Sequence, residues 1–104
     1  MSDKKPVTTA TVKLGTPIAR DGGEIEQVTL RKPKAGELRG LNLQDILQSD
    51  VGALIKLVPR ISDPALIDSE VEDLEADDLA EIGGTIFGFF MTPAQRAAIS
   101  QLTG

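Results

Sequence analysis

The chain has 104 residues, with 16 acidic and 11 basic side chains and a formal net charge of −5. This length fits one domain, and the acidic balance argues against nucleic acid as a partner, because phosphate binding needs clustered Lys and Arg. The absence of Cys and His excludes disulfides, thiol nucleophiles, His-based triads and the usual structural zinc sites. We therefore expect neither a metal nor a cofactor, and no catalytic residues.

Residues 1–10 are polar and non-periodic, which predicts a disordered N-terminal tail before a single domain at residues 11–104. The first residues lack the apolar stretch of a signal peptide. The longest uncharged apolar run, residues 82–91, is about half of the ~20 residues that a membrane-spanning helix needs. We therefore expect a cytoplasmic protein that does not contact a membrane.

Alternating apolar and polar residues predict a β-hairpin over residues 11–32. The turn falls at residues 21–23, an Asp-Gly-Gly sequence that tolerates positive φ. Pro17 interrupts the first strand, which is typical of an irregular strand or a sheet edge. Four apolar side chains are expected on the buried face of this hairpin: Val12, Leu14, Val28 and Leu30.

The rest of the domain, residues 35–102, predicts short helices. Apolar spacing indicates one helix over residues 35–48 and a shorter helix around residues 54–58, which Pro59 is expected to end. A hairpin of this size is marginal alone and needs a surface to pack against. The helices are therefore expected to cover one face of the hairpin.

Three local signals mark the starts of further helices. Asp63 and Pro64 are typical of an N-cap followed by the first helical position. Residues 78–81 and 92–95 each resemble a capping box, and the second would open a final helix that reaches about Leu102. The predicted fold class is α+β, with an N-terminal β-hairpin packed against three or four short α-helices.

Residues 68–81 concentrate half of the acidic side chains of the chain. As a calcium-binding EF-hand loop starting at Asp68, the segment would need Gly where Asp73 stands and Glu where Leu79 stands, so the motif fails. Nothing in the pattern buries a carboxylate for acid catalysis. The segment is interpreted as a solvated face that leads into a helix, and its acids are Asp68, Glu70, Glu72, Asp73, Glu75, Asp77, Asp78 and Glu81.

The uncharged segment that follows contains every aromatic residue of the chain. Its apolar side chains share one helical face, which either joins the core or contacts a partner. We expect Phe90 inside and Phe87 nearer the surface. Gly84 and Gly88 lie on the opposite face, where either another backbone approaches closely or the helix becomes ordered on binding. The candidate partner-binding residues are Ile82, Ile86, Phe87, Phe89, Phe90 and Met91.

Several stretches of the chain resemble the small tail assembly proteins of Mu-like phages and prophages. These are Lys-Leu-Gly-Thr-Pro-Ile at residues 13–18, a Gly-Gly turn, and the run Ile-Glu-Gln-Val-Thr-Leu-Arg-Lys-Pro at residues 25–33, followed by Ala-Gly-Glu-Leu. The Leu-Arg-x-Pro-x-x-Gly portion, residues 30–36, is the most specific. The resemblance covers roughly residues 12–90.

This resemblance implies a non-enzymatic tail assembly chaperone that acts in the host bacterial cytoplasm. Such a protein binds the long, largely helical tape measure protein, and the tail tube protein or a second copy of the chain are further expected partners. The alternative is an acidic inhibitor or DNA-mimic protein that binds a basic partner through its carboxylates. The alternative predicts strongly salt-sensitive binding, whereas apolar burial predicts little effect of salt.

Overall fold

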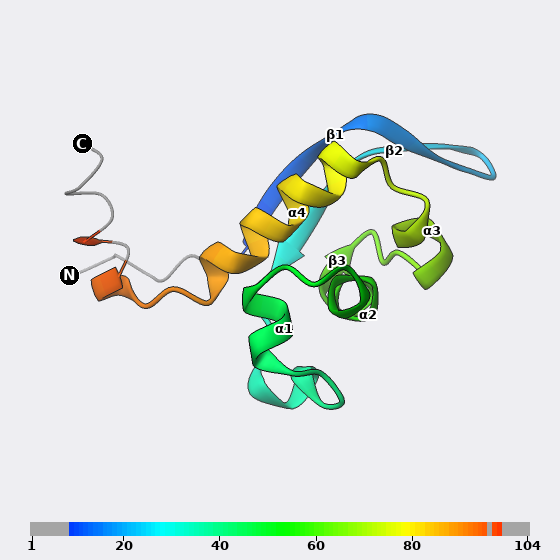
Figure 1. The fold of residues 1–104 in the computed structure, drawn as a ribbon. Helices are drawn as coiled ribbons and strands as arrows, with labels where there is room; N and C mark the ends of the chain where they lie inside the picture. Colours follow the sequence, from blue (N-terminus) through cyan, green and yellow to red (C-terminus); the bar gives the residue numbers. More distant parts are fainter. Residues whose placement is uncertain (1–8, 96, 99–104) are drawn as a thin grey trace.

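The chain folds into an antiparallel sheet packed against short helices, which confirms the predicted α+β class (Figure 1). The computed structural model describes residues 9–95, 97 and 98. A short helical segment that starts at Pro93 follows the last named helix. The named elements, in chain order, are β1 (Thr9–Arg20), β2 (Gly23–Arg31), the 3-10 helix η1 (Ala35–Leu38), α1 (Leu43–Leu47), α2 (Val51–Ile61), β3 (Ser62–Asp63), α3 (Asp68–Glu72) and α4 (Ala76–Phe89).

β1 and β2 form the predicted hairpin, and β3 pairs with two residues of β2 on its other side. The register of the hairpin breaks between Lys13 and Ile18, around the proline that the sequence marked as irregular. β1 already begins at Thr9, so the prediction of a tail over residues 1–10 is wrong for its last two residues, which pair with β2. The other residues of that tail lie outside the described part of the chain.

The core lies between the sheet and helices α2 and α4. The four hairpin side chains that the alternation predicted to face inward are all buried: Val12, Leu14, Val28 and Leu30. Helices α2 and α4 complete the core with apolar side chains at helical spacing: Leu54, Leu57, Val58, Ile61, Ile82, Ile86 and Phe89. As the scarcity of aromatic residues indicates, this core is aliphatic except for Phe89.

Residues 35–48 form two short helices, η1 and α1, and not the single helix predicted. Gly40 lies between them with φ of +80°, a left-handed conformation that ends a helix and that glycine adopts without strain. Asn42 then caps α1, because its side chain accepts a hydrogen bond from the Gln44 N–H at 2.8 Å. The apolar spacing continued across this interruption and concealed it.

Helix α2 continues to Ile61, so the prediction that Pro59 ends it is wrong. Proline removes one intrahelical hydrogen bond and crowds the preceding turn. Leu57, Val58 and Ile61 are nevertheless buried in the core on either side of it. Packing of these side chains outweighs the local cost, since tertiary contacts supply most of the stability of helices in proteins.

Asp63 and Pro64 do not begin a helix, contrary to the prediction from their sequence. Asp63 lies in β3, opposite Thr29 of β2. The next helix, α3, begins at Asp68. Pairing between β3 and β2 joins segments about thirty residues apart, and a local start signal contains no information about such a contact.

Asp78 is a buried carboxylate that supports the break in β1. Helix α4 begins at Ala76, so Asp78 lies inside the first turn and is not the N-cap that the sequence predicted. Its side chain is 4% exposed. Its Oδ1 accepts a hydrogen bond from the Gly15 N–H at 2.7 Å, and its Oδ2 accepts one from the Thr16 N–H at 3.1 Å. These two backbone donors lie where the pairing with β2 is interrupted, so Asp78 replaces the missing strand partner.

The glycine-rich part of α4 packs closely at one glycine only. A Cβ at Gly83 would lie 3.3 Å from both the Leu54 Cδ1 and the Ser49 Oγ. At Gly84 a Cβ would meet no atom of the described residues within 4 Å. The expectation that another backbone approaches closely at Gly84 and Gly88 is therefore wrong within the described residues, and the close contact of this helix is with side chains at Gly83.

The motif that carries the family resemblance forms a clamp between the sheet and η1. Arg31 donates from both terminal nitrogens to the Glu37 carboxylate, at 2.7 Å between Nη1 and Oε1. The Lys34 N–H also donates to Glu37 Oε1, at 2.9 Å. Arg60 of α2 donates from Nη1 to the backbone oxygens of Glu37 and Arg39, at 2.7 and 2.9 Å. The residues of this motif therefore serve to fold the junction between β2 and η1.

A second ion pair holds the far end of the hairpin against α3. Arg20 donates from Nε and Nη2 to the Glu70 carboxylate at 2.7 and 2.6 Å, and from Nη2 to the Ala65 backbone oxygen at 2.7 Å. The Arg20 guanidinium lowers the pKa of Glu70, and the Ile67 N–H adds to this effect. The turn end of the hairpin projects beyond the helical part of the fold (Figure 1). The Arg20 and Glu70 pair attaches this end to α3.

We expect Asp78→Ala to lower the free energy of unfolding by about 1.5–3 kcal/mol, because it leaves two backbone N–H groups without their charged acceptor. Asp77→Ala is the matched control, since Asp77 lies in the same first turn of α4 but is exposed. Chemical denaturation of both variants gives the two free energies. Equal losses would show that Asp78 contributes only as a charge at the helix start.

The lowered pKa of Glu37 predicts that the folded chain loses stability in acid. Its hydrogen bond to Arg31, and then that to the Lys34 N–H, lower the pKa of Glu37 from an ordinary value of 4.5 to about 2. A carboxyl group whose pKa is lower in the folded state than in the unfolded state stabilises the fold. This stabilisation is complete above the unfolded pKa and is lost as the pH falls through the folded pKa. We expect Glu37→Gln to flatten the decline of the melting temperature between about pH 4.5 and 2. A decline identical to that of the unmodified chain would contradict the clamp.

Candidate functional site

The acidic segment, residues 68–81, is only partly the solvated face that the sequence predicted. Glu70 is paired with Arg20, and Asp78 is buried against β1. The other six acids are exposed. Within the described residues, no group of three or more acidic side chains is placed to hold a metal ion.

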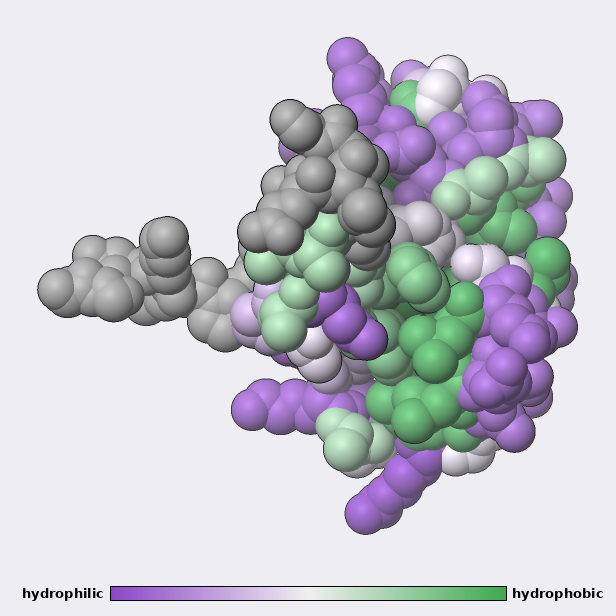
Figure 2. All heavy atoms as spheres, turned by 60° about the vertical axis from the view of Figure 1, so that its left-hand side comes forward, coloured by the Kyte–Doolittle hydropathy of each residue, from purple (hydrophilic) through white to green (hydrophobic). Residues whose placement is uncertain are grey.

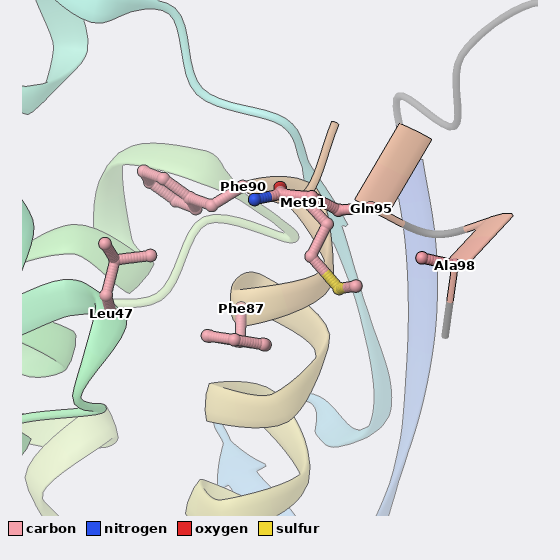
Figure 3. Close-up of a pocket in the computed structure, with 6 residues that line it drawn as sticks. All are labelled: Leu47, Phe87, Phe90, Met91, Gln95 and Ala98. Atoms are coloured by element: carbon pink, nitrogen blue, oxygen red, sulfur yellow. The ribbon is translucent and has the colours of Figure 1, made fainter. Parts of the chain in front are cut away.

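An apolar groove lies where α4 ends. It has a volume of about 440 Å³, and it is lined by Leu47, Phe87, Phe90, Met91, Gln95 and Ala98. We call it the α4 groove. Figure 3 shows Leu47 of α1 on one side and Gln95 and Ala98 on the other, with the two Phe side chains and Met91 between them. Three separate segments of the chain therefore build the groove.

The groove continues into a wider apolar surface on α1. Leu43 and Leu47 are four residues apart, so they share one face of this helix, and they are 53% and 40% exposed. Phe87 of α4 is 43% exposed. The space-filling view shows a contiguous hydrophobic area on this side of the molecule, bordered by hydrophilic residues (Figure 2). Large exposed apolar patches of this kind are typical of interaction sites.

The six predicted partner-binding residues separate into two groups. Ile82, Ile86 and Phe89 are at most 3% exposed and belong to the core. They cannot contact a partner unless the fold opens, so the prediction does not hold for them in the folded chain. Phe87 is exposed, and Phe90 and Met91 are partly exposed at the groove.

The expected order of the Phe side chains is correct for Phe87, which is nearest the surface. The innermost aromatic side chain is Phe89, and Phe90 is partly buried against the core, so the expectation that Phe90 lies inside holds only in part. The helical wheel put Phe89 and Phe90 on one face. Helix α4 ends at Phe89, and Phe90, its C-cap, packs against the core on one side and lines the groove on the other.

Three groove residues were not recognised from the sequence. Leu47 lies in the stretch predicted as one helix over residues 35–48, whose apolar side chains were not considered for a site, and in the structure it belongs to the short helix α1. Gln95 and Ala98 lie in the weak final helix, where the Thr92 capping box was the available signal. That box is confirmed: the Thr92 N–H donates to Gln95 Oε1 at 2.8 Å, and the Gln95 N–H donates to Thr92 Oγ1 at 3.1 Å.

Comparison with known proteins places this sequence in a family. Residues 11–91 match the family described as phage tail assembly chaperone proteins, E, or 41 or 14. Tail assembly protein E of Escherichia phage P2 is 46% identical over 78 residues, which cover 75% of this chain and 86% of that protein.

Tail assembly protein E' of the same phage is 45% identical over 80 residues, which cover 77% of this chain. The matched part spans 56% of the length of E', so much of that relative has no counterpart here. No solved structure matches. None of the described helices is long and apolar enough to cross a membrane. The family match covers most of the chain, including the hairpin, the clamp and α4, and the chain belongs to the phage tail assembly chaperone family.

Proposed function

We propose that this chain binds the tape measure protein during phage tail assembly and that the α4 groove is the contact surface. The role is that of a chaperone without catalytic activity, and it is carried out in the cytoplasm of the host bacterium. Membership of the tail assembly chaperone family supports the general role. The observation that supports the contact surface is the exposure of Phe87 beside an open apolar groove.

The shape and chemistry of the groove suit a helical partner. An amphipathic helix binds in a hydrophobic groove through apolar side chains on one of its faces. The groove and the adjoining face of α1 provide aromatic and aliphatic contacts and few polar groups. The apolar side chains are Leu43, Leu47, Phe87, Phe90 and Met91. Met adapts to different partner side chains, since it is flexible and polarizable.

The exposed acids have a different part in this proposal. A chaperone with an open apolar groove needs charge elsewhere on its surface to stay dispersed before it binds. Six of the eight acids in residues 68–81 are exposed, and within the described part of the chain no ion pair holds their carboxylates. We assign them to keeping the free chain in solution.

The acidic inhibitor or DNA-mimic remains the alternative function. It requires carboxylates arranged on one face for a basic partner, but Glu70 and Asp78 are engaged within the fold. The two functions differ in their response to salt, because exposed charge pairs are screened and apolar burial is not. The tail tube protein or a second copy of the chain would be rival occupants of the same groove.

We expect Phe87→Ala to weaken binding of the tape measure protein by about 30-fold, the effect of losing about 2 kcal/mol at an aromatic hot spot. Phe87 is exposed, so the variant should melt at nearly the same temperature as the unmodified chain. Titration calorimetry with the tape measure protein of the same phage measures the affinity, in low and in high salt.

Ile67→Ala is the matched control for this experiment. Ile67 is 60% exposed, more than Phe87, but it precedes α3 and does not line the groove. We expect its affinity to be unchanged. Equal affinity of Phe87→Ala and the unmodified chain would reject the groove as the contact surface. Binding that disappears in high salt would favour the acidic inhibitor.

A further inference from the structure

One side of helix α4 is exposed from its first turn to its last. With 100° between successive residues, five exposed residues lie within an arc of about 120°, opposite the buried face of the helix. We call this arc the α4 strip, and it consists of Asp77, Ala80, Glu81, Gly84 and Phe87. Phe87 also lines the α4 groove, so the strip continues the groove toward the start of the helix.

The chemistry of the α4 strip changes along the helix. Asp77 and Glu81 place two carboxylates in its first half, and the Phe87 ring stands at its end. Two small residues, Ala80 and Gly84, lower its middle. A Cβ at Gly84 would meet no atom of the described residues within 4 Å. Because the distance between packed helices depends on the side chains at their contact, another helix can approach α4 closely here.

The two carboxylates of the strip are not neutralised within the described part of the chain. The ion pairs found there join Arg20 to Glu70 and Arg31 to Glu37, and neither includes the strip. The two acids are four residues apart on the same face, a spacing at which like charges destabilise a helix slightly. In the free chain these charges help to keep the protein in solution. A cation from a partner would relieve their repulsion.

The spacing along the strip fits the spacing of side chains on a partner helix. A rise of 1.5 Å per residue places Glu81 about 9 Å and Asp77 about 15 Å from Phe87 along the axis of α4. On one face of a helix, side chains recur after seven and eight residues, or about 10.5 and 12 Å. A helix that lies along α4 with an apolar side chain on Phe87 therefore brings a side chain two turns away between the two carboxylates.

We propose that the α4 strip extends the α4 groove and binds an amphipathic helix. The apolar anchor of this helix contacts Phe87, and a Lys or Arg two turns from the anchor lies between Asp77 and Glu81. The inference rests on the proposed function, because the helix belongs to the tape measure protein. Apolar burial supplies most of the affinity, since exposed charge pairs contribute little each. The carboxylates select which segment of the partner binds, and in which direction it lies.

Added bulk at Gly84 tests whether a helix lies on the strip. We expect Gly84→Gln to melt no lower than the unmodified chain, because Gln favours a helix more than Gly does and a Cβ meets no described atom there. In titration calorimetry it should bind the tape measure protein about tenfold more weakly, because the added side chain holds the partner helix away. Ala19→Gln is the matched control, since it adds the same side chain at an exposed position of β1. Equal affinities of the three chains would overturn the proposal.

Charge reversal tests the two carboxylates. Glu81→Lys and Glu72→Lys change the net charge by the same amount at exposed acids, but Glu72 belongs to α3 and lies outside the strip. In low salt we expect Glu81→Lys to weaken binding about tenfold and Glu72→Lys by less than about twofold, because only the first places a cation against that of the partner. The difference should shrink in high salt, where binding itself persists. Equal losses would show that the acids act only through the net charge, and the proposed pairing would be wrong.

The same measurements separate this inference from the proposed function. If Phe87→Ala weakens binding while Gly84→Gln and Glu81→Lys do not, the groove is the contact surface and the strip is rejected. If Gly84→Gln keeps its affinity but abolishes self-association of the free chain in sedimentation, a second copy covers the strip and the proposal is again rejected. If the unmodified chain does not bind the tape measure protein, both the proposed function and the strip fail.

Discussion

The orientation of α4 on the hairpin is the constraint on which the rest of the structure depends. The buried stripe of this helix runs through Asp78, Ile82, Ile86 and Phe89, at helical spacing. The apolar side chains of this stripe pack on the sheet. The Asp78 carboxylate accepts two hydrogen bonds from backbone N–H groups at the break in β1. A rotation of the helix would remove these contacts together. With Phe89 held inward, Phe87 is about 200° away around the helix and must point outward.

Charges near the hairpin act mainly in folding. The Arg31 and Glu37 pair closes one end of the sheet onto η1, and the Arg20 and Glu70 pair attaches the other end to α3. Both pairs are exposed and bidentate. The two parallel hydrogen bonds of a bidentate pair fix the relative orientation of the Arg and carboxylate groups, which a single surface contact does not. They place the hairpin at a definite angle to the helices.

The groove lies at the place where these constraints end. Helix α1 begins after a glycine break, α4 ends at Phe89, and a new helical segment begins at Pro93. Side chains at such junctions are not fully covered by neighbouring elements, which leaves Leu47 and Phe87 exposed. A groove formed in this way can change its outer wall without disturbing the core. The wall at Gln95 and Ala98 follows the family region and fits this arrangement.

The sequence by itself determined the hairpin and its four inward side chains, the apolar face of the helix after the acidic segment, and the capping box at Thr92, because each depends on a local period or on neighbouring residues. It did not reveal β3, the continuation of α2 through Pro59 or the burial of Asp78, which depend on partners far along the chain. For the candidate site, the sequence predicted that Ile82, Ile86 and Phe89 contact a partner, but these side chains are buried in the core. Only the tertiary structure decided which side of α4 the sheet covers, and therefore that Phe87 and Leu47 are left exposed. A helical period describes a face, but the packing of the other elements decides whether that face is buried.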